Sequence, residues 1–334
     1  MSKTIILNNR PVGMPTLDNF KFISEEIKSL NKGEIKVQAK YVSVDPYLRG
    51  RMSASKSYVA PFEVGKPITS GIVAEVITSE NENFAVGDFI SGILDWKEEQ
   101  ILTAETLKEI RKVDGSKIPL SAYLGVVGMT GLTAYLGLTQ IGKPQKGETL
   151  LVSGAAGAVG SIVGQIGKIL GLRVVGIAGS DEKVSLLKSE FGYDEGINYN
   201  STEDMQSAIH KACPDGVDIY FDNVGGSISD AVLFSINKFA RIIICGAISM
   251  YNETSLPTGI SVQPFLVKNS ALMQGFIVSN YQEKFPEAAK QLGTWLAENK
   301  LTYRETIVEG FDNIPQAFLD LFEGKNKGKM IVKV

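Results

Sequence analysis

The residues best suited to chemistry form a run of small side chains in the middle of the chain. Gly154-Ala155-Ala156-Gly157-Ala158-Val159-Gly160 follows the apolar segment Thr149–Ser153 and leads directly into a helical pattern. Glycines permit a tight turn and a close approach of the backbone, and the N–H groups that open a helix attract anions. The placement predicts a loop that binds the pyrophosphate of a dinucleotide. A purely structural glycine turn is the alternative interpretation.

The residues after the next strand indicate which dinucleotide would bind. An NAD site has an acidic residue about 20 positions further on, at the tip of the second strand, to hold the ribose 2′-OH. Here that strand ends in Ile177-Ala178-Gly179-Ser180, and Asp181 follows one residue later. Lys183 offers a positive charge for a 2′-phosphate, while Gly179 and Ser180 offer room and a donor. We therefore favour NADP over NAD. The alternative for Lys183 is a solvated lysine in a first helical turn.

Few residues could bind a metal ion or act as a base. The chain contains two cysteines, Cys213 and Cys245, and one histidine, His210. A structural zinc site needs four Cys or His ligands and a catalytic site usually takes three protein ligands, so we predict no metal site. His210 is also the only histidine base available to a Ser-His-Asp or Cys-His hydrolase. It lies in the pattern of a short amphipathic helix, and we expect it at the surface.

The overall composition is that of a globular protein with room for two domains. The chain has 334 residues, of which 44% are hydrophobic and 21% charged, with a formal net charge of −3. This charge gives no basis for binding a phosphate backbone. The first ten residues lack the apolar stretch of a signal peptide, and no segment is long enough to span a membrane. We expect a cytoplasmic protein that binds neither nucleic acid nor membranes.

Strands and helices alternate from about residue 149 onward. Short runs rich in Val, Ile and Leu occupy residues 149–153, 173–178, 217–221, 241–245 and 272–278. They show no polar alternation, as expected of strands that are covered on both faces. Apolar residues recur at helical spacing over residues 158–171 and 285–296. The pattern predicts βαβ units and hence an α/β fold with a doubly wound parallel sheet.

The first 120 residues have a different pattern. Segments 35–44, 71–76 and 89–93 are typical of β-strands and are separated by Gly, Pro and polar turns, which predicts a mainly β domain. The chain ends with a strand from Thr306 onward, a short helix and a last strand at 329–334. From the pattern alone, this end could extend either domain.

Six motifs together resemble one protein family along essentially the whole chain. The family is the zinc-free medium-chain dehydrogenase/reductase superfamily, in its branch of leukotriene B4 12-hydroxydehydrogenases, prostaglandin reductases and bacterial curcumin reductases. The motifs are the following: Val44-Asp45-Pro46-Tyr47-Leu48-Arg49, Gly128-Met129-Thr130-Gly131-Leu132-Thr133-Ala134-Tyr135, the glycine loop 154–160, Gly179-Ser180-Asp181-Glu182-Lys183, Tyr220-Phe221-Asp222-Asn223-Val224-Gly225-Gly226 and Cys245-Gly246-Ala247-Ile248-Ser249.

The resemblance implies a division into two domains. A GroES-like substrate domain would comprise residues 1–122, completed by residues 305–334, and a Rossmann NADP-binding domain would comprise residues 123–304. The active site would lie in the cleft between them. The resemblance also implies a homodimer formed through the Rossmann domain.

The resemblance further implies which residues contact the cofactor. They would bind the pyrophosphate, flank the adenosine phosphate or line the remaining groove. These residues are Gly157, Ala158, Val159, Gly160, Lys183, Tyr199, Asn223, Cys245, Gly246, Ala247, Ile248, Ser249, Tyr251, Phe276, Ile277, Val278 and Asn326. Alternatives remain for two of them, because Cys245 could be a buried thiol at a strand end and Phe276 a core aromatic residue.

The implied reaction is NADPH-dependent reduction of the carbon–carbon double bond of α,β-unsaturated aldehydes and ketones. Hydride would add to the β-carbon, and the resulting enolate would need an oxygen donor and a weak acid. Tyrosines are the natural candidates, with water as another source of the proton. Tyr47, Tyr58 and Tyr251 each lie in a matching motif or loop, and an ordinary core or rim position is the alternative for each. Some relatives carry a tyrosine where this chain has Lys268.

Two other functions stay open from the sequence. A quinone reductase of the same superfamily would use the same cofactor with another acceptor. A non-enzymatic protein could retain the nucleotide fold as a binding or packing module. The natural substrate cannot be inferred, because the shape of a pocket depends on loop conformations that the sequence does not determine.

Overall fold

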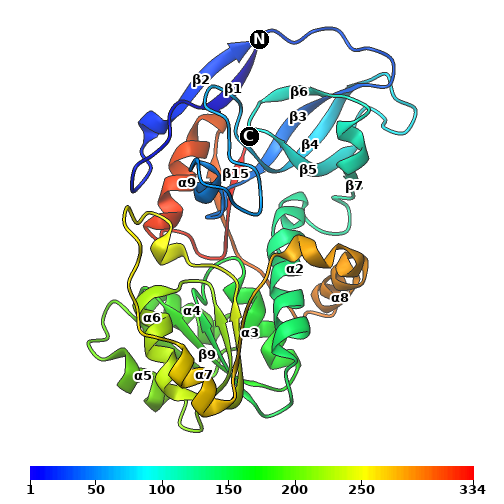
Figure 1. The fold of residues 1–334 in the computed structure, drawn as a ribbon. Coiled ribbons are helices and arrows are strands. Elements are labelled where there is room, and N and C mark those ends of the chain that lie inside the picture. The colour runs from blue at the N-terminus through cyan, green and yellow to red at the C-terminus, as the bar shows by residue number, and fades with distance from the viewer. The chain divides into compact units, whose positions relative to one another are not determined.

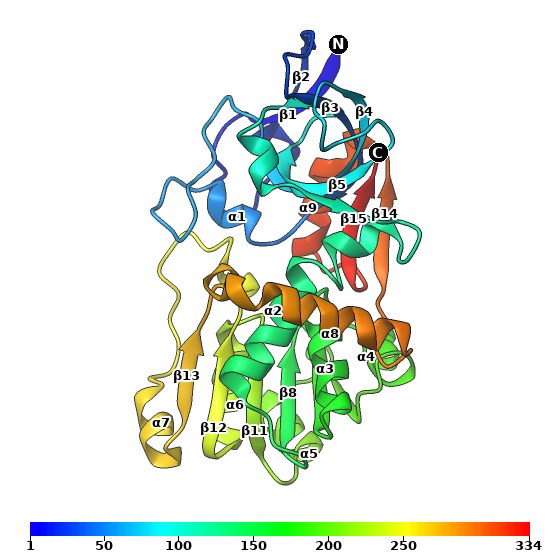
Figure 2. The same ribbon diagram turned by 90° about the vertical axis from the view of Figure 1, so that its right-hand side faces the viewer.

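The computed structural model describes all residues, 1–334, and divides them into two compact units (Figures 1 and 2). The first unit comprises Met1–Leu124, Thr306–Asn326 and Met330–Val334. The second comprises Gly125–Glu305 and Lys327–Lys329. Each unit contains its own sheet and its own buried core.

The second unit is built on six parallel strands. Their order is β10 (Glu195–Asn198), β9 (Arg173–Ala178), β8 (Thr149–Ser153), β11 (Val217–Asp222), β12 (Ile236–Ile244) and β13 (Leu272–Gly275). All five residues of β8 are buried, as expected for a strand covered on both faces. The order confirms the predicted doubly wound sheet.

Helices cover both faces of this sheet. In Figure 1, α5, α6 and α7 lie on one side of it and α2, α3 and α8 on the other. Their bounds are α2 (Met129–Leu136), α3 (Gly160–Ile169), α4 (Asp181–Ser189), α5 (Met205–Ala212), α6 (Gly226–Val232), α7 (Gln263–Asn269) and α8 (Phe285–Ala297). His210 is exposed on α5, which confirms its predicted surface position. No helix has the length and apolar character needed to cross a membrane.

Several predicted bounds are wrong at their ends, for local reasons. The strand predicted at 241–245 begins earlier, at Ile236. Its first half was not predicted because it contains the polar residues Asn237 and Lys238, and Phe239 has an unusual φ of 66° there. The strand predicted at 272–278 ends at Gly275. The helix predicted from Ala158 begins at Gly160. Strand β10 was not predicted, because only one of its four residues, Ile197, is a buried apolar residue.

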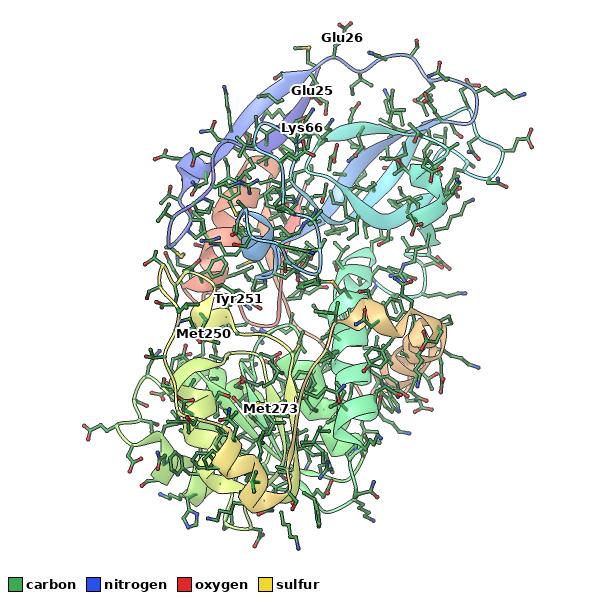
Figure 3. The ribbon with its side chains drawn as sticks, in the orientation of Figure 1. Glu25, Glu26, Lys66, Met250, Tyr251 and Met273 are labelled. Carbon is green, nitrogen blue, oxygen red and sulfur yellow. The ribbon has the colours of Figure 1, made fainter.

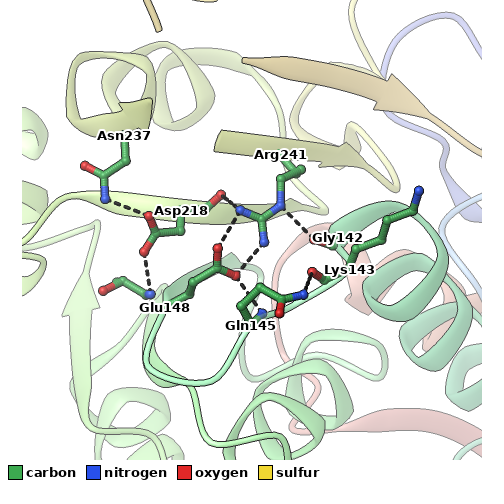
Figure 4. Close-up of polar contacts among 8 residues, drawn as sticks. Gly142, Lys143, Gln145, Glu148, Asp218, Asn237 and Arg241 are labelled. Atoms are coloured by element: carbon green, nitrogen blue, oxygen red, sulfur yellow. Dashed lines mark hydrogen bonds and ion pairs between the residues drawn. The ribbon is translucent and has the colours of Figure 1, made fainter. Parts of the chain in front are cut away.

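An ionic network joins Glu148, just before β8, to residues of β11 and β12 (Figure 4). Arg241 of β12 contacts both carboxylate oxygens of Glu148, with Nη1–Oε1 and Nη2–Oε2 distances of 2.9 and 2.5 Å. Asp218 of β11 accepts hydrogen bonds from the Thr149 backbone N–H at 2.8 Å and from Asn237 at 2.8 Å. The network helps to fix the register of β8, β11 and β12, and the predicted loop follows the carboxyl end of β8.

The first unit is mainly β, as predicted. One sheet has the order β14 (Glu305–Glu309), β15 (Lys329–Lys333), β3 (Ile35–Ser43), β4 (Thr69–Ser79), β5 (Phe89–Asp95) and β7 (Arg111–Val113), with β6 (Glu99–Leu102) also paired to β3. Strands β1 (Ser2–Leu7) and β2 (Phe20–Glu25) form a hairpin. The terminal strand β15 pairs with β3, so the end of the chain returns to the first sheet. Helices α1 (Leu48–Arg51) and α9 (Ile314–Phe322) complete this unit.

Candidate active site

The strand order of the second unit reverses between β8 and β11, whose carboxyl ends lie side by side. Crevices at such a reversal are where open α/β sheets bind ligands. Asp222 is buried at the end of β11, and its carboxylate holds the chain together at this reversal. Its Oδ1 accepts hydrogen bonds from Ser153 Oγ at 2.8 Å and from the backbone N–H groups of Val224 and Gly225 at 2.9 Å each. One carboxylate therefore holds the turn after β11 against the end of β8.

The glycine loop leaves β8 at this point. Gly154 has a φ of 59°, and its carbonyl accepts a hydrogen bond from the Gly157 N–H at 3.0 Å. A Cβ on Gly160 would lie 2.7 Å from the Ala155 Cα, so only glycine permits this close approach of helix and loop. The side chain of Val159, the N-cap residue of α3, accepts no hydrogen bond from the first turn. The tight glycine turn at the start of a helix fits a pyrophosphate.

A buried tyrosine supports the loop from beneath. The Tyr193 hydroxyl donates a hydrogen bond to the Gly160 carbonyl at 2.7 Å, and its ring packs against Gly164 of α3. Burial raises the pKa of Tyr193 far above its ordinary value, so the hydroxyl stays protonated as this donor. No sequence signal pointed to Tyr193, because its partners Gly160 and Gly164 lie about 30 residues away in the chain.

The residues after β9 are arranged around Gly179. The half-exposed ring of Tyr199 covers this glycine, whose Cβ would lie 2.7 Å from the tyrosine hydroxyl oxygen. Asp181 accepts a hydrogen bond from Asn198 Nδ2 at 2.7 Å. Ser180 is the N-cap of α4, and its Oγ accepts from the Lys183 N–H at 3.2 Å. The Asp181 carboxylate is thus bound by Asn198. Ser180 caps the start of α4, a role that was not predicted for it.

Lys183 follows in the first turn of α4 and is half-buried. Burial lowers the pKa of its ammonium group, and the positive charge of Lys327 lowers it further. Lys327 itself forms an ion pair with Glu182. Lys327 is not among the predicted cofactor residues, because nothing in a local pattern links it to Glu182, so far away in the chain. This end of the site is consequently rich in positive charge.

The loop after β12 closes on the turn after β11. The Cys245 N–H donates to the Asp222 carbonyl at 2.8 Å, and Ser249 Oγ donates to the Val224 carbonyl at 2.6 Å. Asn223 Nδ2 donates to the Ser153 carbonyl at 2.7 Å. The predicted groove residues Asn223 and Cys245–Ser249 therefore lie together at the carboxyl ends of β8, β11 and β12. Burial raises the pKa of the Cys245 thiol to about 12, so this cysteine is not a thiolate nucleophile.

Tyr251 ends the same loop and lies beside Met250 (Figure 3). The Ala247 N–H donates to its hydroxyl oxygen at 3.3 Å. Burial raises the pKa of Tyr251 above its ordinary value of 10.0, and this hydrogen bond works in the opposite direction. The hydroxyl is thus held in the neutral form that can act as a donor.

Phe276, Ile277 and Val278 follow the end of β13 and are half-buried. The Phe276 ring packs edge-on against Phe221 at 6.4 Å between centroids and against Tyr281 at 6.5 Å. A Cβ on Gly137 would lie 2.7 Å from the Phe276 ring. Phe276 therefore has a packing role, in addition to its position at the carboxyl edge of the sheet.

Asn326 is the one predicted cofactor residue that belongs to the first unit. It is half-buried and is the last residue of the segment Thr306–Asn326 of the first unit. The next residue, Lys327, belongs to the second unit.

The two other candidate tyrosines belong to the first unit. Tyr47 is half-buried at the start of α1, and desolvation, followed by the charge of Asp45, raises its pKa well above the ordinary value of 10.0. Tyr58 is 61% exposed in the segment after α1. Arg51 fixes this segment, since Nε donates to the Ala60 carbonyl at 3.1 Å and the guanidinium lies 4.0 Å from the centroid of the Phe62 ring. The charge of Arg51 favours the ionised form of Tyr47, against the effect of burial.

Comparison with known proteins identifies relatives along the whole chain. A profile described as the N-terminal domain of oxidoreductase matches residues 3–110, and one described as zinc-binding dehydrogenase matches residues 158–294. An NADPH-dependent curcumin reductase of Escherichia coli (strain K12) is 40% identical over 334 residues, which cover 98% of this chain and 96% of that protein. Prostaglandin reductase 1 of Sus scrofa is 43% identical over 333 residues and 99% of both proteins.

A solved structure agrees with these sequence matches. The crystal structure of CurA from Vibrio vulnificus in complex with NADPH has 42% sequence identity to this chain and a TM-score of 0.93, with 99% of both chains covered. The chain belongs to the zinc-free medium-chain dehydrogenase/reductase superfamily. Within this superfamily it falls in the branch of the prostaglandin and curcumin reductases, as the motifs predicted.

One matching family model is described as zinc-binding dehydrogenase. It covers residues 158–294, which lie in the second unit. The structure contains no group of three or more His, Cys, Asp or Glu residues that could hold a metal ion. Cys213 is buried, and burial raises the pKa of its thiol to about 12. The donor set therefore does not fit a zinc centre.

Lys268 is the position at which the sequence predicts a departure from some relatives. Lys268 is exposed near the end of α7. Tyr47, Tyr58 and Tyr251 are the proton donors predicted from the sequence, with water as the alternative.

Proposed function

We propose that this chain is an NADPH-dependent reductase of the carbon–carbon double bond in α,β-unsaturated aldehydes and ketones, of the alkenal or curcumin type. The observation that carries the proposal is the glycine loop and basic adenosine end, found in a chain at least 40% identical to curcumin and prostaglandin reductases over nearly its full length. The name of the Vibrio vulnificus complex supports NADPH as the cofactor.

The second unit, close to the predicted range 123–304, is the proposed cofactor-binding domain. Gly157–Gly160 would hold the pyrophosphate, and Lys183 and Tyr199 the adenosine phosphate. Asn223, Cys245–Tyr251, Phe276–Val278 and Asn326 would line the rest of the groove. These residues fit the group, because the approach at Gly160 leaves no room for a Cβ and because Lys183 and Lys327 lie near each other at the end proposed for the extra phosphate.

NADPH, when bound, supplies the hydride that reduces the β-carbon of the substrate. The chain's own residues must then stabilise the negative charge on the carbonyl oxygen and deliver a proton to the α-carbon. A neutral tyrosine hydroxyl can do both, since it donates a hydrogen bond and is a weak acid. Tyr47 and Tyr251 have raised pKa values, so each keeps its proton throughout the physiological pH range.

Tyr58 is the candidate proton donor that we favour. It is the most exposed of the three, and Arg51 fixes the segment that carries it through Ala60 and Phe62. Tyr47 and Tyr251 would then orient the substrate or donate to its carbonyl oxygen. Water remains the alternative source of the proton.

The proposal is tested by following NADPH oxidation with an enal, an enone and a quinone as acceptors. We expect turnover with the enal and the enone, and no more than slow turnover with the quinone. Preferential reduction of the quinone would favour a quinone oxidoreductase of the same superfamily. If NADPH bound but none of the acceptors were reduced, the chain would be a non-enzymatic nucleotide-binding protein.

We further propose that the protein is a homodimer formed through the second unit. Strand β13 is an outer edge of the sheet, and unpaired strand edges readily pair with a second chain. Apolar side chains near this edge are exposed: Leu272 at 46%, Val267 at 81% and Phe239 at 62%. Light scattering on the full chain is expected to give the mass of a dimer. The Leu272→Lys variant is expected to give a lower average mass, because it places a charge at the proposed interface. A monomeric mass for the unaltered chain would refute this proposal.

We propose a cytoplasmic location from the composition of the chain, which is 44% hydrophobic and 21% charged. Cell fractionation tests it, and recovery with the membrane or secreted fraction would contradict it.

A further inference from the structure

A second lysine is fixed next to the glycine loop by backbone contacts. Lys327 opens the short segment Lys327–Lys329, which belongs to the second unit. The Gly328 N–H donates to the Ala156 carbonyl at 2.8 Å, and Gly328 forms a parallel bridge with Gly157. The Lys329 N–H donates to the Arg304 carbonyl at 2.9 Å. The segment is thus docked on the phosphate loop itself.

The docking depends on a glycine. Gly328 has a φ of 70°, and a Cβ there would collide with the Arg304 carbonyl. A left-handed backbone at such close contact favours glycine over every other residue. The backbone of Lys327 is therefore held in one place, while its long side chain stays able to change partner.

The Lys327 side chain points to the first turn of α4. Its Nζ forms an ion pair with Glu182, the neighbour of Lys183 in the sequence. Lys327 lies close enough for its charge to lower the pKa of Lys183, after the larger effect of burial. The hydrogen bond from Lys327 lowers the pKa of Glu182, as do the charges of Lys327, Arg304 and Lys183. Lys327 thus pairs with the exposed carboxylate of Glu182, which also feels the charge of Lys183.

We propose that Lys327 is a second cation of the subsite for the adenosine 2′-phosphate, and that Glu182 is its counter-ion when no dinucleotide is bound. The inference rests on the NADP assignment of the proposed function. A phosphate monoester carries about −1.5 to −2 charges at neutral pH, more than one lysine can neutralise. On binding, the Lys327 ammonium would exchange the Glu182 carboxylate for the phosphate oxygens, with no change in its backbone position.

Lys327 would therefore determine specificity rather than take part in hydride transfer. Its removal should weaken every ligand that carries the 2′-phosphate and leave ligands without it unaffected. For a partly exposed ammonium facing a doubly charged phosphate, we expect a weakening of about fivefold. Replacing Glu182 by Gln should tighten binding of the same ligands, because Lys327 would no longer have a competing carboxylate.

The test is calorimetric titration of the full-length protein with adenosine 2′,5′-bisphosphate and with 5′-AMP, at low and moderate salt. The variants are Lys327→Gln, Lys327→Arg and Glu182→Gln. Lys325→Gln is the matched control, since Lys325 is an exposed lysine two positions away that pairs with Asp320 and Glu323. The thermal stability of each variant is measured alongside.

We expect Lys327→Gln to weaken the bisphosphate about fivefold and to leave 5′-AMP unchanged, with affinity restored by Lys327→Arg. Lys325→Gln should change neither affinity. An unchanged ratio of the two affinities in Lys327→Gln would overturn the inference, as would an equal loss for both ligands. The carbonyl-reductase function fails separately: a protein that shows the Lys327 effect but reduces no unsaturated carbonyl would leave this inference standing.

Discussion

Gly160→Ala is the substitution that most sharply separates a dinucleotide loop from a structural turn. Gly160 is the first residue of α3, and a Cβ at this position would lie 2.7 Å from the Ala155 Cα and still closer to the Gly154 carbonyl oxygen. Both obstacles are backbone atoms, which cannot rotate aside as a side chain would. The helix and the loop must therefore move apart.

The size of the effect follows from this geometry. Non-bonded carbon atoms ordinarily approach to about 3.5–4.0 Å, so the displacement needed is about 1 Å. Overpacking of this kind costs about 1–3 kcal/mol of unfolding free energy, and we expect a loss of about 2 kcal/mol. The displaced loop would also lose hydrogen bonds to a charged phosphate worth about 1.5–3 kcal/mol each, which raises the Kd for NADPH at least tenfold.

Urea denaturation and a fluorescence titration with NADPH measure the two quantities. Gly293→Ala in α8 is the matched control, because a Cβ there meets nothing within 4 Å. This control should gain up to about 1 kcal/mol from helix propensity and bind NADPH as the unaltered chain does. If Gly160→Ala lost stability yet kept full affinity for NADPH, the loop would be a structural turn and our reasoning would be wrong.

Three further predictions concern other parts of the molecule. Lys183→Ala should raise KM for NADPH much more than KM for NADH, and equal changes would refute the contact with the 2′-phosphate. Tyr58→Phe should lower kcat on an enone about tenfold or more with little change in NADPH affinity, because it removes a general acid; an unchanged kcat would exclude Tyr58. Arg241→Met should cost about 2 kcal/mol of unfolding free energy at neutral pH, because it leaves the Glu148 carboxylate partly buried and unpaired. Desolvation raises the pKa of Glu148, but the hydrogen bonds from Arg241 and Gln145 outweigh it and hold the pKa below 4.5. The loss of unfolding free energy caused by Arg241→Met should therefore persist above that pH and shrink as the pH falls below it. Urea denaturation at a series of pH values measures this loss, and a loss that stayed constant would contradict the prediction.

Local patterns were sufficient to predict the elements that carry the loop. The unbroken apolar run of β8 and the helical spacing within α3 each report on burial of a continuous stretch of chain. The glycine loop between them could be located for the same reason. Strand β10 escaped prediction because its polar residues carry little of that signal.

The supporting residues of the site could not be predicted, because they act across the fold. Asp222 looks like an ordinary strand-end acid in the sequence, yet it organises the turn after β11 through four hydrogen bonds. Lys327 reaches α4 only because Gly328 docks on the loop at Ala156. The contacts of Asp222 with Ser153 and of Lys327 with Glu182 join residues distant in the chain, and no spacing rule encodes them.

The central claim is that the chain uses NADPH to reduce a conjugated carbon–carbon double bond. The most direct test is incubation with an enone and NADPH that carries deuterium at the transferable position of the nicotinamide, followed by NMR of the product. We predict a saturated ketone with deuterium on the carbon that was β to the carbonyl. Deuterium on the carbonyl carbon, or an unlabelled and unreduced enone beside bound cofactor, would contradict the account.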